Sequence, residues 1–510
     1  MGAGRRLPDQ DCGIQVGIGA QRKVRTCISL LTAGLLCASL LGGAEAPARR
    51  VILVDIDGVG RNTFEEAYLG RRLPNFERLL GPVSDSSAFA HALRFTNATA
   101  VFPTVTMSGQ ASIFTGVYPG KHGVVGNEWF DRSRGRLVDY MSGAGVACVY
   151  GFVLLGSPEC AGGIANQHLE TPTVYEAASQ AGKSTLVVFS HYWKGSGRVV
   201  LPSLPEALAF LQGGSVDYEA FDTRMMDHVV EELTIGGMPD LLTLYFAGAD
   251  AAAPERGANG QVAYLGRVID VQVGRLLDAL ETLEPAWRDS TLFVVIADHG
   301  RTEVDAAPDD HLAKSRILDA LARAGYDSGR SQLAVNGGMA HLYLRSRFGD
   351  EPWSESPPFE DVLRAAQEIH REAQSGLPVE FVLVRTPENG YQVYAETEAG
   401  EPQLQPLPKE IAVLVRGLEN SRSGGILIVL KEGRYFLGQP GGFIGEHGGI
   451  HARDLAVPLI LARGGITAGH SAAAVGTVNL ARTIADYLGF AMQGVEPALP
   501  PASSNPPAIK

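Results

Sequence analysis

Carboxylate, imidazole and hydroxyl side chains recur in this sequence where apolar segments end. Asp57 follows the run VILVDI, and the adjacent pair Asp298 and His299 follows LFVVIA. His447 lies in the segment GEHGG. Aspartate and histidine side chains on such loops can bind zinc or a similar divalent ion. Thr106 lies in FPTVTMSGQASIFTG, where we expect a helix to begin, and a threonine hydroxyl activated by a metal ion can attack phosphorus.

The expected position of Thr106 at a helix N-terminus suits an anionic substrate, because backbone N–H groups and the positive end of the helix dipole meet there. Each residue alone has a simpler explanation. A strand-terminal Asp forms turns, a Thr at a helix start is an N-cap, and a His before Gly is a loop residue. As a group, their types and positions indicate a metal-dependent hydrolase.

Buried strands and helices alternate along the chain and must position these residues. Apolar runs typical of strands cover residues 51–56, 185–189, 241–246, 292–296 and 457–461. Helical patterns cover residues 172–180, 221–233, 262–283 and 479–488. The alternation predicts an α/β fold with a largely parallel central sheet and helices on both faces. Ligands bind at the carboxyl ends of such strands, where Asp57, Asp250 and Asp298 are expected.

Residues 345–440 carry many prolines and shorter alternating runs, over 379–385 and 426–430. We interpret them as a smaller inserted α+β cap in a catalytic core formed by residues 47–344 and 441–496. The tail 497–510 is rich in Pro and Ser and is expected to be disordered.

The first 46 residues have the layout of a signal peptide and leader. Basic residues between 22 and 25 precede an apolar run over 28–41, and small residues that suit cleavage follow. An uncleaved anchor and a misread start are the alternatives. We therefore expect an exported protein, periplasmic or secreted, with no membrane span once the signal is removed.

Cysteine usage fits export. Three of the five cysteines lie in the leader, so the mature chain keeps Cys148 and Cys160. In an oxidising compartment the pair can form a disulfide, and two separate buried thiols are the alternative.

A net charge of −13 argues against a nucleic-acid-binding surface, because Lys and Arg hold phosphate backbones. It does not argue against a small phosphate-ester substrate, since bound metal ions would reverse the local charge. The sequence does not specify an oligomeric state.

Five segments resemble the alkaline phosphatase superfamily, and specifically its nucleotide pyrophosphatase/phosphodiesterase branch. They are ILVDIDGVG at 52–60, FPTVTMSGQASIFTGVYPGKHGVVGN at 102–127, PDLLTLYFAGAD at 239–250, IADHGRTEV at 296–304 and GEHGGIHARDLAVPLIL at 445–461. The most specific is the pattern Pro-Thr-x-Thr, then Thr-Gly-x-Tyr-Pro-x-x-His-Gly, then Asn127. The resemblance implies an alkaline-phosphatase-like core and hydrolysis of phosphodiester or nucleotide pyrophosphate bonds.

The resemblance also implies roles around the first of two divalent metal ions, expected to be Zn²⁺. Thr106 is the nucleophile and forms a phospho-threonine intermediate. Asp57, Asp298 and His299 hold the ion that activates Thr106, which is itself a ligand. Asn127 binds a non-bridging phosphate oxygen, together with the backbone N–H of Thr106 or its neighbour.

The second ion is implied to lie at Asp250 and His447, and here the sequence departs from its family. The family pattern is Asp-x-x-x-His, but residue 254 is Pro and has no ligand atom. Two protein ligands are too few for tight zinc binding. Glu255 or His451 could complete the site. Otherwise the site takes another metal or water, or the second ion is lost and the enzyme is weak or inactive.

Two further functions remain as hypotheses. One is hydrolysis of a phosphonate or phosphate monoester, although the neutral Asn127 favours a diester. The other is a degenerate, non-catalytic member of the superfamily, because of Pro254. The segment Met-Ser-Gly-Gln after Thr106 also differs from the best-known members, so recognition of a nucleobase does not follow from the resemblance. Of the other histidines, we interpret His122 as structural and His341 as a candidate to line the cleft.

Overall fold

The computed structural model describes residues 48–83, 89–153, 157–206, 217–304, 313–346, 351–436 and 445–501. The predicted leader over residues 1–46 and the tail beyond residue 501 lie outside these ranges, so both stay predictions. Within the described ranges, each helix is too short or too polar to span a bilayer.

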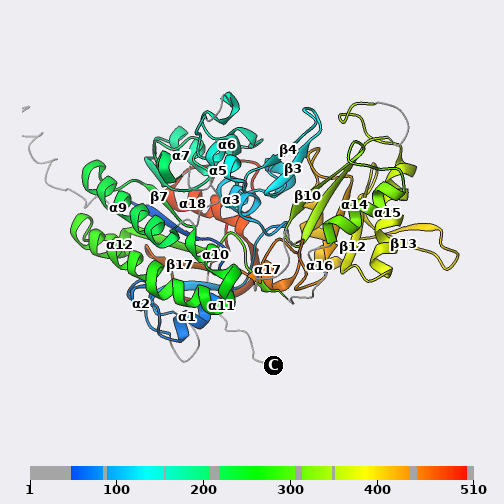
Figure 1. The fold of residues 1–510 in the computed structure, drawn as a ribbon. Coiled ribbons are helices and arrows are strands. Elements are labelled where there is room, and N and C mark those ends of the chain that lie inside the picture. Colours follow the sequence, from blue (N-terminus) through cyan, green and yellow to red (C-terminus); the bar gives the residue numbers. More distant parts are fainter. Residues whose placement is uncertain are drawn as a thin grey trace, which may run out of the picture. The chain divides into compact units, whose positions relative to one another are not determined.

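An eight-stranded sheet forms the centre of the fold (Figure 1). Its strands, in spatial order, are β18 (Gly469–Gly476), β2 (Ala92–Thr99), β17 (Leu459–Arg463), β8 (Thr291–Ile296), β1 (Arg50–Ile56), β7 (Leu241–Phe246), β5 (Thr185–Val188) and β6 (Arg198–Val200). Neighbouring strands pair in parallel, except that β17 runs antiparallel to both β8 and β2. The largely parallel sheet predicted from the sequence is confirmed.

Helices cover both faces of this sheet (Figure 1). One group comprises α1 (Arg61–Leu69), α2 (Pro74–Leu80), α9 (Tyr218–Gly236), α11 (Ala253–Tyr264) and α12 (Asp270–Leu283). The other comprises α3 (Thr106–Thr115), α7 (Val174–Gln180) and α18 (Leu480–Leu488). Because helices bury both faces, β7 and β8 are buried along their whole length, which is why they appear in the sequence as uninterrupted apolar runs.

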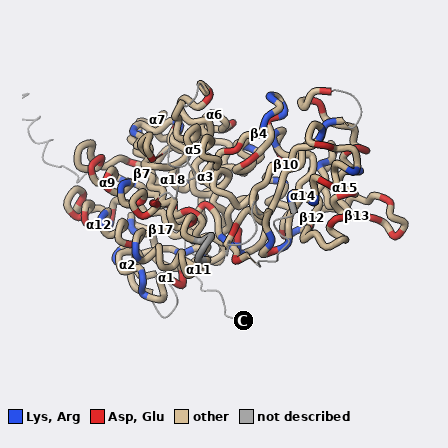
Figure 2. Tube along the Cα trace, in the orientation of Figure 1, with Lys and Arg blue, Asp and Glu red and all other residues tan. Residues whose placement is uncertain are grey.

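The long helix predicted over 262–283 differs in the structure. It consists of α11 and α12 joined by a π-helical segment at Leu265–Ile269, and α11 begins nine residues earlier, at Ala253. Gly266 lies in the π-helical segment, where the low helix propensity of glycine weakens the regular pattern. Charged residues, most of them acidic, lie along the outer helices α9 and α12 (Figure 2), as expected for helices with one solvated face.

A second, six-stranded sheet is entirely antiparallel. Its order is β10 (Ser331–Asn336), β11 (Met339–Leu344), β15 (Ile426–Leu430), β12 (Val379–Thr386), β13 (Gly390–Glu396) and β14 (Pro402–Gln405). The helices α14 (Ala313–Arg323), α15 (Phe359–Gln374) and α16 (Lys409–Arg416) pack against it. The sheet agrees with the expected α+β character of this region. It includes two strands that precede residue 345, and the domain boundaries stay a prediction.

Short elements connect the two sheets, which belong to one compact unit. They include the hairpin of β3 (Glu128–Asp131) and β4 (Arg136–Asp139), and the pair β9 (Thr302–Glu303) and β16 (Gly445–Glu446). The short helices are α4 (Pro119–His122), α5 (Gly143–Val149), η1 (Pro158–Cys160), α6 (Ile164–His168), α10 (Gly248–Ala251), α13 (Trp287–Ser290), α17 (Ala452–Leu455) and η4 (Thr477–Asn479). The Asn336 side chain fixes β10 to β3, because it accepts from the Glu128 N–H at 3.0 Å and donates to the Glu128 carbonyl at 2.9 Å.

Candidate active site

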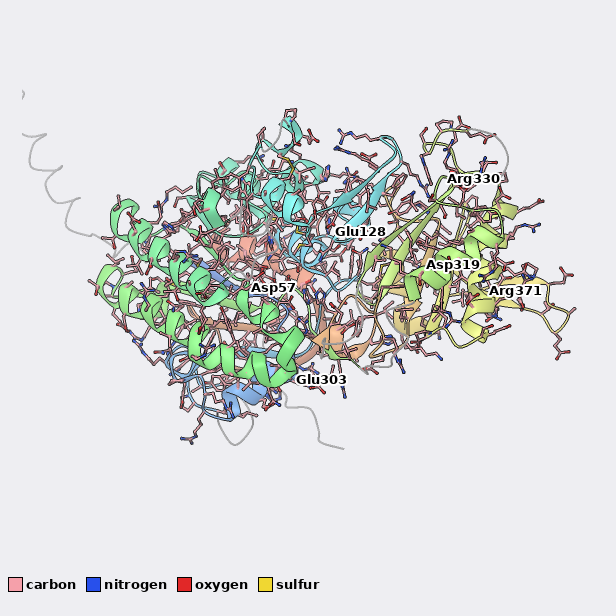
Figure 3. The ribbon with its side chains drawn as sticks, viewed as in Figure 1. Asp57, Glu128, Glu303, Asp319, Arg330 and Arg371 are labelled. Atoms are coloured by element: carbon pink, nitrogen blue, oxygen red, sulfur yellow. A yellow bond between two sulfur atoms is a disulfide. The ribbon has the colours of Figure 1, made fainter. Side chains whose placement is uncertain are left out.

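Three neighbouring strands of the central sheet place carboxylates at one edge. Asp57 follows β1 directly, Asp298 lies two residues after β8, and Asp250 lies on α10, which follows β7. Since β1 pairs in parallel with β8 on one side and with β7 on the other, the carboxyl ends of the three strands coincide. Figure 3 marks Asp57 inside the molecule and Glu128 on the hairpin between the two sheets.

Thr106 is the first residue of α3, and every residue of that helix is buried. Its Oγ1 atom lies 3.4 Å from Nε2 of His299. The Met107 N–H donates to Oδ1 of Asn127 at 3.0 Å, so one backbone amide of the helix N-terminus is already used by Asn127. This contact leaves the Nδ2 amide of Asn127 to donate elsewhere. The structure thus places a hydroxyl, an amide and a helix N-terminus together.

Asp57, Asp298 and His299 form what we call the first cluster, and their ligand atoms all lie within 4.8 Å of one another. Nε2 of His299 is 3.3 Å from Oδ1 of Asp57 and 3.9 Å from Oδ1 of Asp298. Tyr245 donates its hydroxyl to the other Asp57 oxygen, and the Gly58 N–H donates to Oδ1 of Asp298 at 3.1 Å. These contacts fix the orientation of both carboxylates.

The first cluster fits a divalent cation. Oδ1 of Asp57 and Oδ2 of Asp298 are buried, and neither has a hydrogen-bond partner among the described residues. Burying carboxylate oxygens without hydrogen bonds is costly unless a nearby positive charge compensates them. Two carboxylates and one imidazole are also a donor set that zinc uses in proteins. Thr106 lies beside these donors and could add its hydroxyl oxygen.

The pKa shifts of Asp298 and His299 also favour a bound cation at the first cluster. Burial, and then the neighbouring Asp57 carboxylate, raise the pKa of Asp298 well above its ordinary value. Burial alone would lower the pKa of His299, but the carboxylates of Asp298 and Asp57 outweigh it and raise that pKa to about 10. Both directions follow from two negative groups buried side by side, and such a pair attracts positive charge.

Asp250 and His447 form what we call the second cluster. Nε2 of His447 is 3.9 Å from Oδ2 of Asp250, and Nδ1 lies 2.9 Å from the Thr104 carbonyl oxygen. The ring of His447 stacks on that of His299, with centroids 4.0 Å apart. His299 is therefore within reach of both clusters, and its ligand atom lies within 4.8 Å of those of Asp250 and His447.

Two glycines allow the elements of the site to approach one another. Gly58 has φ of +63°, and a Cβ atom there would lie 2.1 Å from Oδ1 of Asp250. At Gly109, in α3, a Cβ atom would lie 2.6 Å from the Asp298 carbonyl oxygen. Larger residues at these positions would push Asp250 away from β1 and α3 away from Asp298.

A cavity of about 400 Å³ opens beside Thr106. Five carboxylates line it, from Asp57, Glu128, Asp139, Asp250 and Glu446. Aromatic side chains of Tyr150, Tyr218, Phe221 and Tyr245 line it as well, as do Asn127 and His447. Among the described residues, no Lys or Arg contributes to its wall. Bound cations would offset these carboxylates and favour an anionic ester.

Sequence reasoning did not single out Arg301, which lies beside the second cluster. Its guanidinium forms an ion pair with Oδ1 of Asp250, donates to the Asp250 carbonyl at 3.1 Å, and donates to the Gly445 carbonyl at 2.6 Å. Burial would raise the pKa of Asp250, but Arg301, followed by His447 and His299, lowers it to about 2. The only sign of this contact in the sequence was an arginine two residues after the Asp298-His299 pair.

Of the two residues considered as replacements at the second cluster, the structure describes the side chain of His451 only, and His451 does not complete the cluster. Pro254 lies in the first turn of α11, and the Glu255 side chain lies outside what the structure describes. His451 is engaged elsewhere, because its Nε2 atom lies 2.9 Å from the Leu430 carbonyl oxygen and 3.4 Å from the Glu380 carboxylate.

The other histidines divide between structural positions and the cavity wall. His122 is buried and pairs with Ser112 at 2.9 Å, as expected of a structural residue. His341 is buried between the Val125 carbonyl and the Gly424 N–H, and it does not line the cavity. His191 does line the cavity, and its Nδ1 atom lies 3.1 Å from Oε1 of Gln110.

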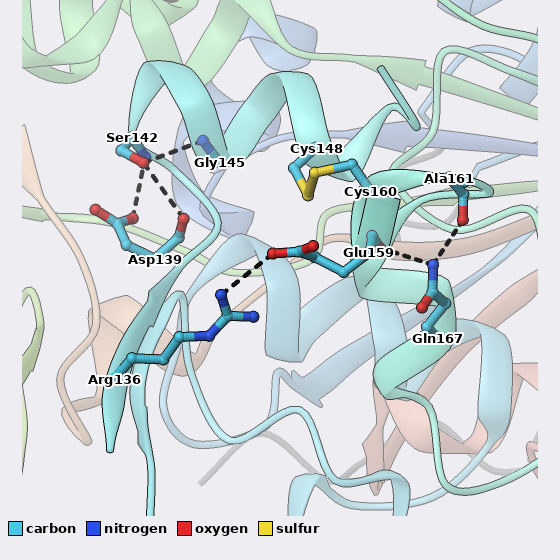
Figure 4. The surroundings of a disulfide bond; sticks show 9 residues. All are labelled: Arg136, Asp139, Ser142, Gly145, Cys148, Glu159, Cys160, Ala161 and Gln167. Carbon is cyan, nitrogen blue, oxygen red and sulfur yellow. Dashed lines mark hydrogen bonds and ion pairs between the residues drawn. A yellow bond between two sulfur atoms is a disulfide. The ribbon is translucent and has the colours of Figure 1, made fainter. Parts of the chain in front are cut away.

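Cys148 and Cys160 are joined by a disulfide (Figure 4), which decides between the two alternatives left by the sequence. The bond connects α5 to η1. Val146 on α5 and Tyr150 just after it line the cavity, so the disulfide supports one of its walls. Figure 4 also shows Arg136 of β4 paired with Glu159 at 3.2 Å, beside the disulfide.

Comparison with known proteins agrees with this geometry. The chain matches the family described as type I phosphodiesterase / nucleotide pyrophosphatase over residues 51–451. It is similar to venom phosphodiesterase 2 of Crotalus adamanteus, with 23% identity over 54% of this chain and 30% of that protein. The chain therefore spans less than a third of the length of that relative.

Two solved structures share the fold. Mouse ectonucleotide pyrophosphatase/phosphodiesterase 5 superposes with a TM-score of 0.57 and 16% identity, over 89% of this chain and 98% of that chain. An inactive variant of the mouse protein, in which a threonine is replaced by alanine, was solved in complex with AMP. It superposes with a TM-score of 0.56 and 16% identity over 89% and 97% of the two chains.

Proposed function

Because the chain belongs to the type I phosphodiesterase / nucleotide pyrophosphatase family, we propose that it hydrolyses phosphodiester or nucleotide pyrophosphate bonds with Thr106 as the nucleophile. The observation that carries this proposal is the position of the Thr106 hydroxyl. It lies at the start of α3, at the wall of the cavity, and 3.4 Å from a histidine of the first cluster.

The proposal includes a divalent ion, with zinc as our choice, held by Asp57, Asp298, His299 and the Thr106 oxygen. When bound, such an ion supplies Lewis-acid activation of the Thr106 hydroxyl. The support is the pair of buried carboxylate oxygens that have no hydrogen-bond partner among the described residues.

The reaction then proceeds in two displacements. Thr106 Oγ1 loses its proton and forms a bond to phosphorus while the bond from phosphorus to the leaving oxygen breaks, and the leaving group departs as an alcohol with that proton. The product is a phospho-threonine intermediate in which phosphorus keeps its second ester group. Water next attacks phosphorus, the bond to Thr106 breaks, and a proton returns to the threonine oxygen. Asn127, oriented by the Met107 N–H, would donate from Nδ2 to a non-bridging oxygen in both steps. The N-terminus of α3 adds its dipole to the stabilisation of this anion.

Charge favours a diester over a monoester in this site. A monoester carries up to two negative charges, whereas a diester carries one. Five carboxylates line the cavity, the phosphate-binding side chain Asn127 is neutral, and no Lys or Arg lines it among the described residues. The less charged substrate therefore meets less repulsion.

Two observations support a nucleotide ester within the diester class. Tyr150, Tyr218 and Phe221 line the cavity, and aromatic rings stack on nucleobases. The mouse relative of the same fold was solved in complex with AMP. We also propose export to the periplasm or the medium, since the disulfide between Cys148 and Cys160 persists in oxidising compartments.

A substrate panel tests the proposed function. Wild type, Thr106→Ser and Thr106→Ala are assayed with zinc on one nucleotide diester, one phosphate monoester and one phosphonate. We expect the diester to give the highest kcat/KM, Thr106→Ser to keep part of it, and Thr106→Ala to lose it. A higher kcat/KM for the monoester or the phosphonate would show that the substrate is not a diester. A wild-type chain that binds no metal and cleaves none of the three would show a degenerate, non-catalytic member.

A further inference from the structure

The second cluster lacks ligands because His299 can serve only one ion. Nδ1 of His299 lies 2.9 Å from the Gly300 carbonyl oxygen and is used as a donor there, so only Nε2 can bind a metal. Nε2 faces Asp57 at 3.3 Å and Thr106 at 3.4 Å, on the side of the first cluster. If His299 completes the first cluster, Asp250 and His447 remain as the clustered donors for a second ion among the side chains that the structure describes. Glu446 contacts Nε2 of His447 at 3.5 Å but belongs to neither cluster. The donors present therefore do not fit a tightly held second ion, for which zinc needs at least three protein ligands.

An arginine side chain already compensates the negative charge of Asp250. The Arg301 side chain is 5% exposed, and its guanidinium contacts Oδ1 of Asp250 as well as the carbonyl oxygen of the same residue. Its other terminal nitrogen donates to the Gly445 carbonyl at 2.6 Å. Asp250 thus has one carboxylate oxygen occupied by a permanent positive charge, since arginine does not lose its proton in proteins.

The backbone holds Arg301 in this place. Arg301 precedes β9, and β9 pairs with β16, which begins at Gly445. The same two-stranded ladder fixes His447, the next residue after β16. Arg301 does not line the cavity, so it reaches the site only through Asp250 and is a positioning residue. A guanidinium fixed on one oxygen of Asp250 also repels a divalent ion approaching the other.

We infer that Arg301 takes the place of a second divalent ion at Asp250, so that the chain holds a single ion, at the first cluster. This inference rests on the proposed function, because it presumes that the first cluster is a metal site. It differs from a merely weakened second site in one respect. Arg301 supplies the positive charge that a second ion would bring to Asp250, and removing Arg301 should make room for that ion.

Zinc binding to the full chain tests this inference. The proteins are wild type, Arg301→Met, Arg301→Lys, Pro254→His, and the double variant Arg301→Met with Pro254→His. Each is stripped with a chelator and titrated with Zn²⁺ alone. Bound zinc per chain is read by elemental analysis, and affinity by calorimetry. Arg301→Met keeps the length of the side chain without its charge, and Arg301→Lys is the matched control that keeps the charge.

We expect one zinc ion per chain in wild type and in Arg301→Lys. Pro254→His alone should gain a second ion only weakly, because Arg301 still occupies Asp250. The double variant should bind the second ion at least tenfold more tightly than Pro254→His. A change in folding alone would not produce a new bound ion, so this readout separates the inferred role from a structural one.

Two results would overturn the inference. One is a wild-type chain that already holds two zinc ions tightly, which needs no variant to be observed. The other is a double variant whose second ion binds no better than that of Pro254→His. Either leaves the proposed function standing, provided that wild type cleaves the diester. A wild-type chain without any bound zinc overturns the proposed function and this inference together.

Discussion

The first cluster and the second cluster lie at neighbouring strand ends, yet their carboxylates are compensated differently. In the first cluster, one oxygen each of Asp57 and Asp298 is buried without a hydrogen-bond partner among the described residues. In the second, the Asp250 carboxylate is paired with Arg301. In the proposed function an added cation compensates the first arrangement, whereas the second already contains the guanidinium of Arg301.

This difference shows that the number of metal ligands in a site and the compensation of its carboxylate charges are separate properties. The resemblance implies a metal ligand at residue 254, and Pro254 supplies none, which alone would leave Asp250 uncompensated beside the cavity. Arg301 restores the charge balance without restoring a ligand atom. A site can therefore keep the electrostatic character of its family after losing the donors that a metal ion needs.

The largest expected effect comes from removing one carboxylate from each cluster. Asp57→Ala should lose both bound zinc and diester turnover, by more than roughly 100-fold, since even outer partners of metal ligands cost 10- to 100-fold. Asp250→Ala should leave the zinc content unchanged and lower turnover less. Elemental analysis and kcat/KM on the same samples provide the measurement. Equal loss of zinc in the two variants would contradict the distinction between the clusters.

A smaller effect on stability and activity is expected at Gly58, which follows Asp57 of the first cluster and approaches Asp250 of the second. Gly58→Ala places a methyl group 2.1 Å from Oδ1 of Asp250, at φ of +63°. Gly182→Ala is the matched control, because Gly182 has φ of +73° and no atom within 4 Å of the added Cβ. Both lose about 1–2 kcal/mol to backbone strain. Gly58→Ala should lose about 1–3 kcal/mol more, from overpacking, together with activity.

Urea unfolding of the two glycine variants measures this difference, with kcat/KM taken in parallel. Equal stability and equal activity of Gly58→Ala and Gly182→Ala would show that Asp250 does not depend on its contact with β1.

The smallest effect on the site is expected from the disulfide, which lies away from both clusters. Replacing Cys148 and Cys160 together by Ala should lower the free energy of unfolding by about 3 kcal/mol, as for a loop of this length. Zinc content should not change, because no ligand is attached to α5 or η1. Thermal unfolding with and without reductant, beside zinc analysis, tests both statements. Loss of zinc in the double variant would connect the cavity wall to the first cluster.

The fold was predictable because its central strands are buried on both faces. Segments such as 241–246 and 292–296 have no solvent side, so burial leaves an uninterrupted apolar run in the sequence. The antiparallel sheet was harder to delimit. Ser331–Asn336 alternates between buried and half-buried residues, a weaker pattern that begins before the prolines used to place the insertion.

The candidate site was predictable where its residues are adjacent in sequence, end a strand or begin a helix. Asp57, Asp298, His299 and Thr106 belong to this class, and the structure brings them together. Arg301 was not predictable, because its partner Asp250 lies 51 residues away and the contact depends on the pairing of β9 with β16. His191 was missed for the same reason, since only the tertiary structure places it at the cavity wall.

Covalent capture of the nucleophile tests the central claim most directly. Wild type and Thr106→Ala are mixed with a nucleotide diester, quenched in acid during a single turnover, digested with trypsin and analysed by mass spectrometry. Thr106 lies in the tryptic peptide 95–121, and fragmentation assigns the modified residue within it. We predict an adduct on Thr106 in wild type whose phosphorus keeps the second ester group of the diester, and neither adduct nor turnover in Thr106→Ala. An adduct on another residue, or wild-type turnover by Thr106→Ala, would contradict the account.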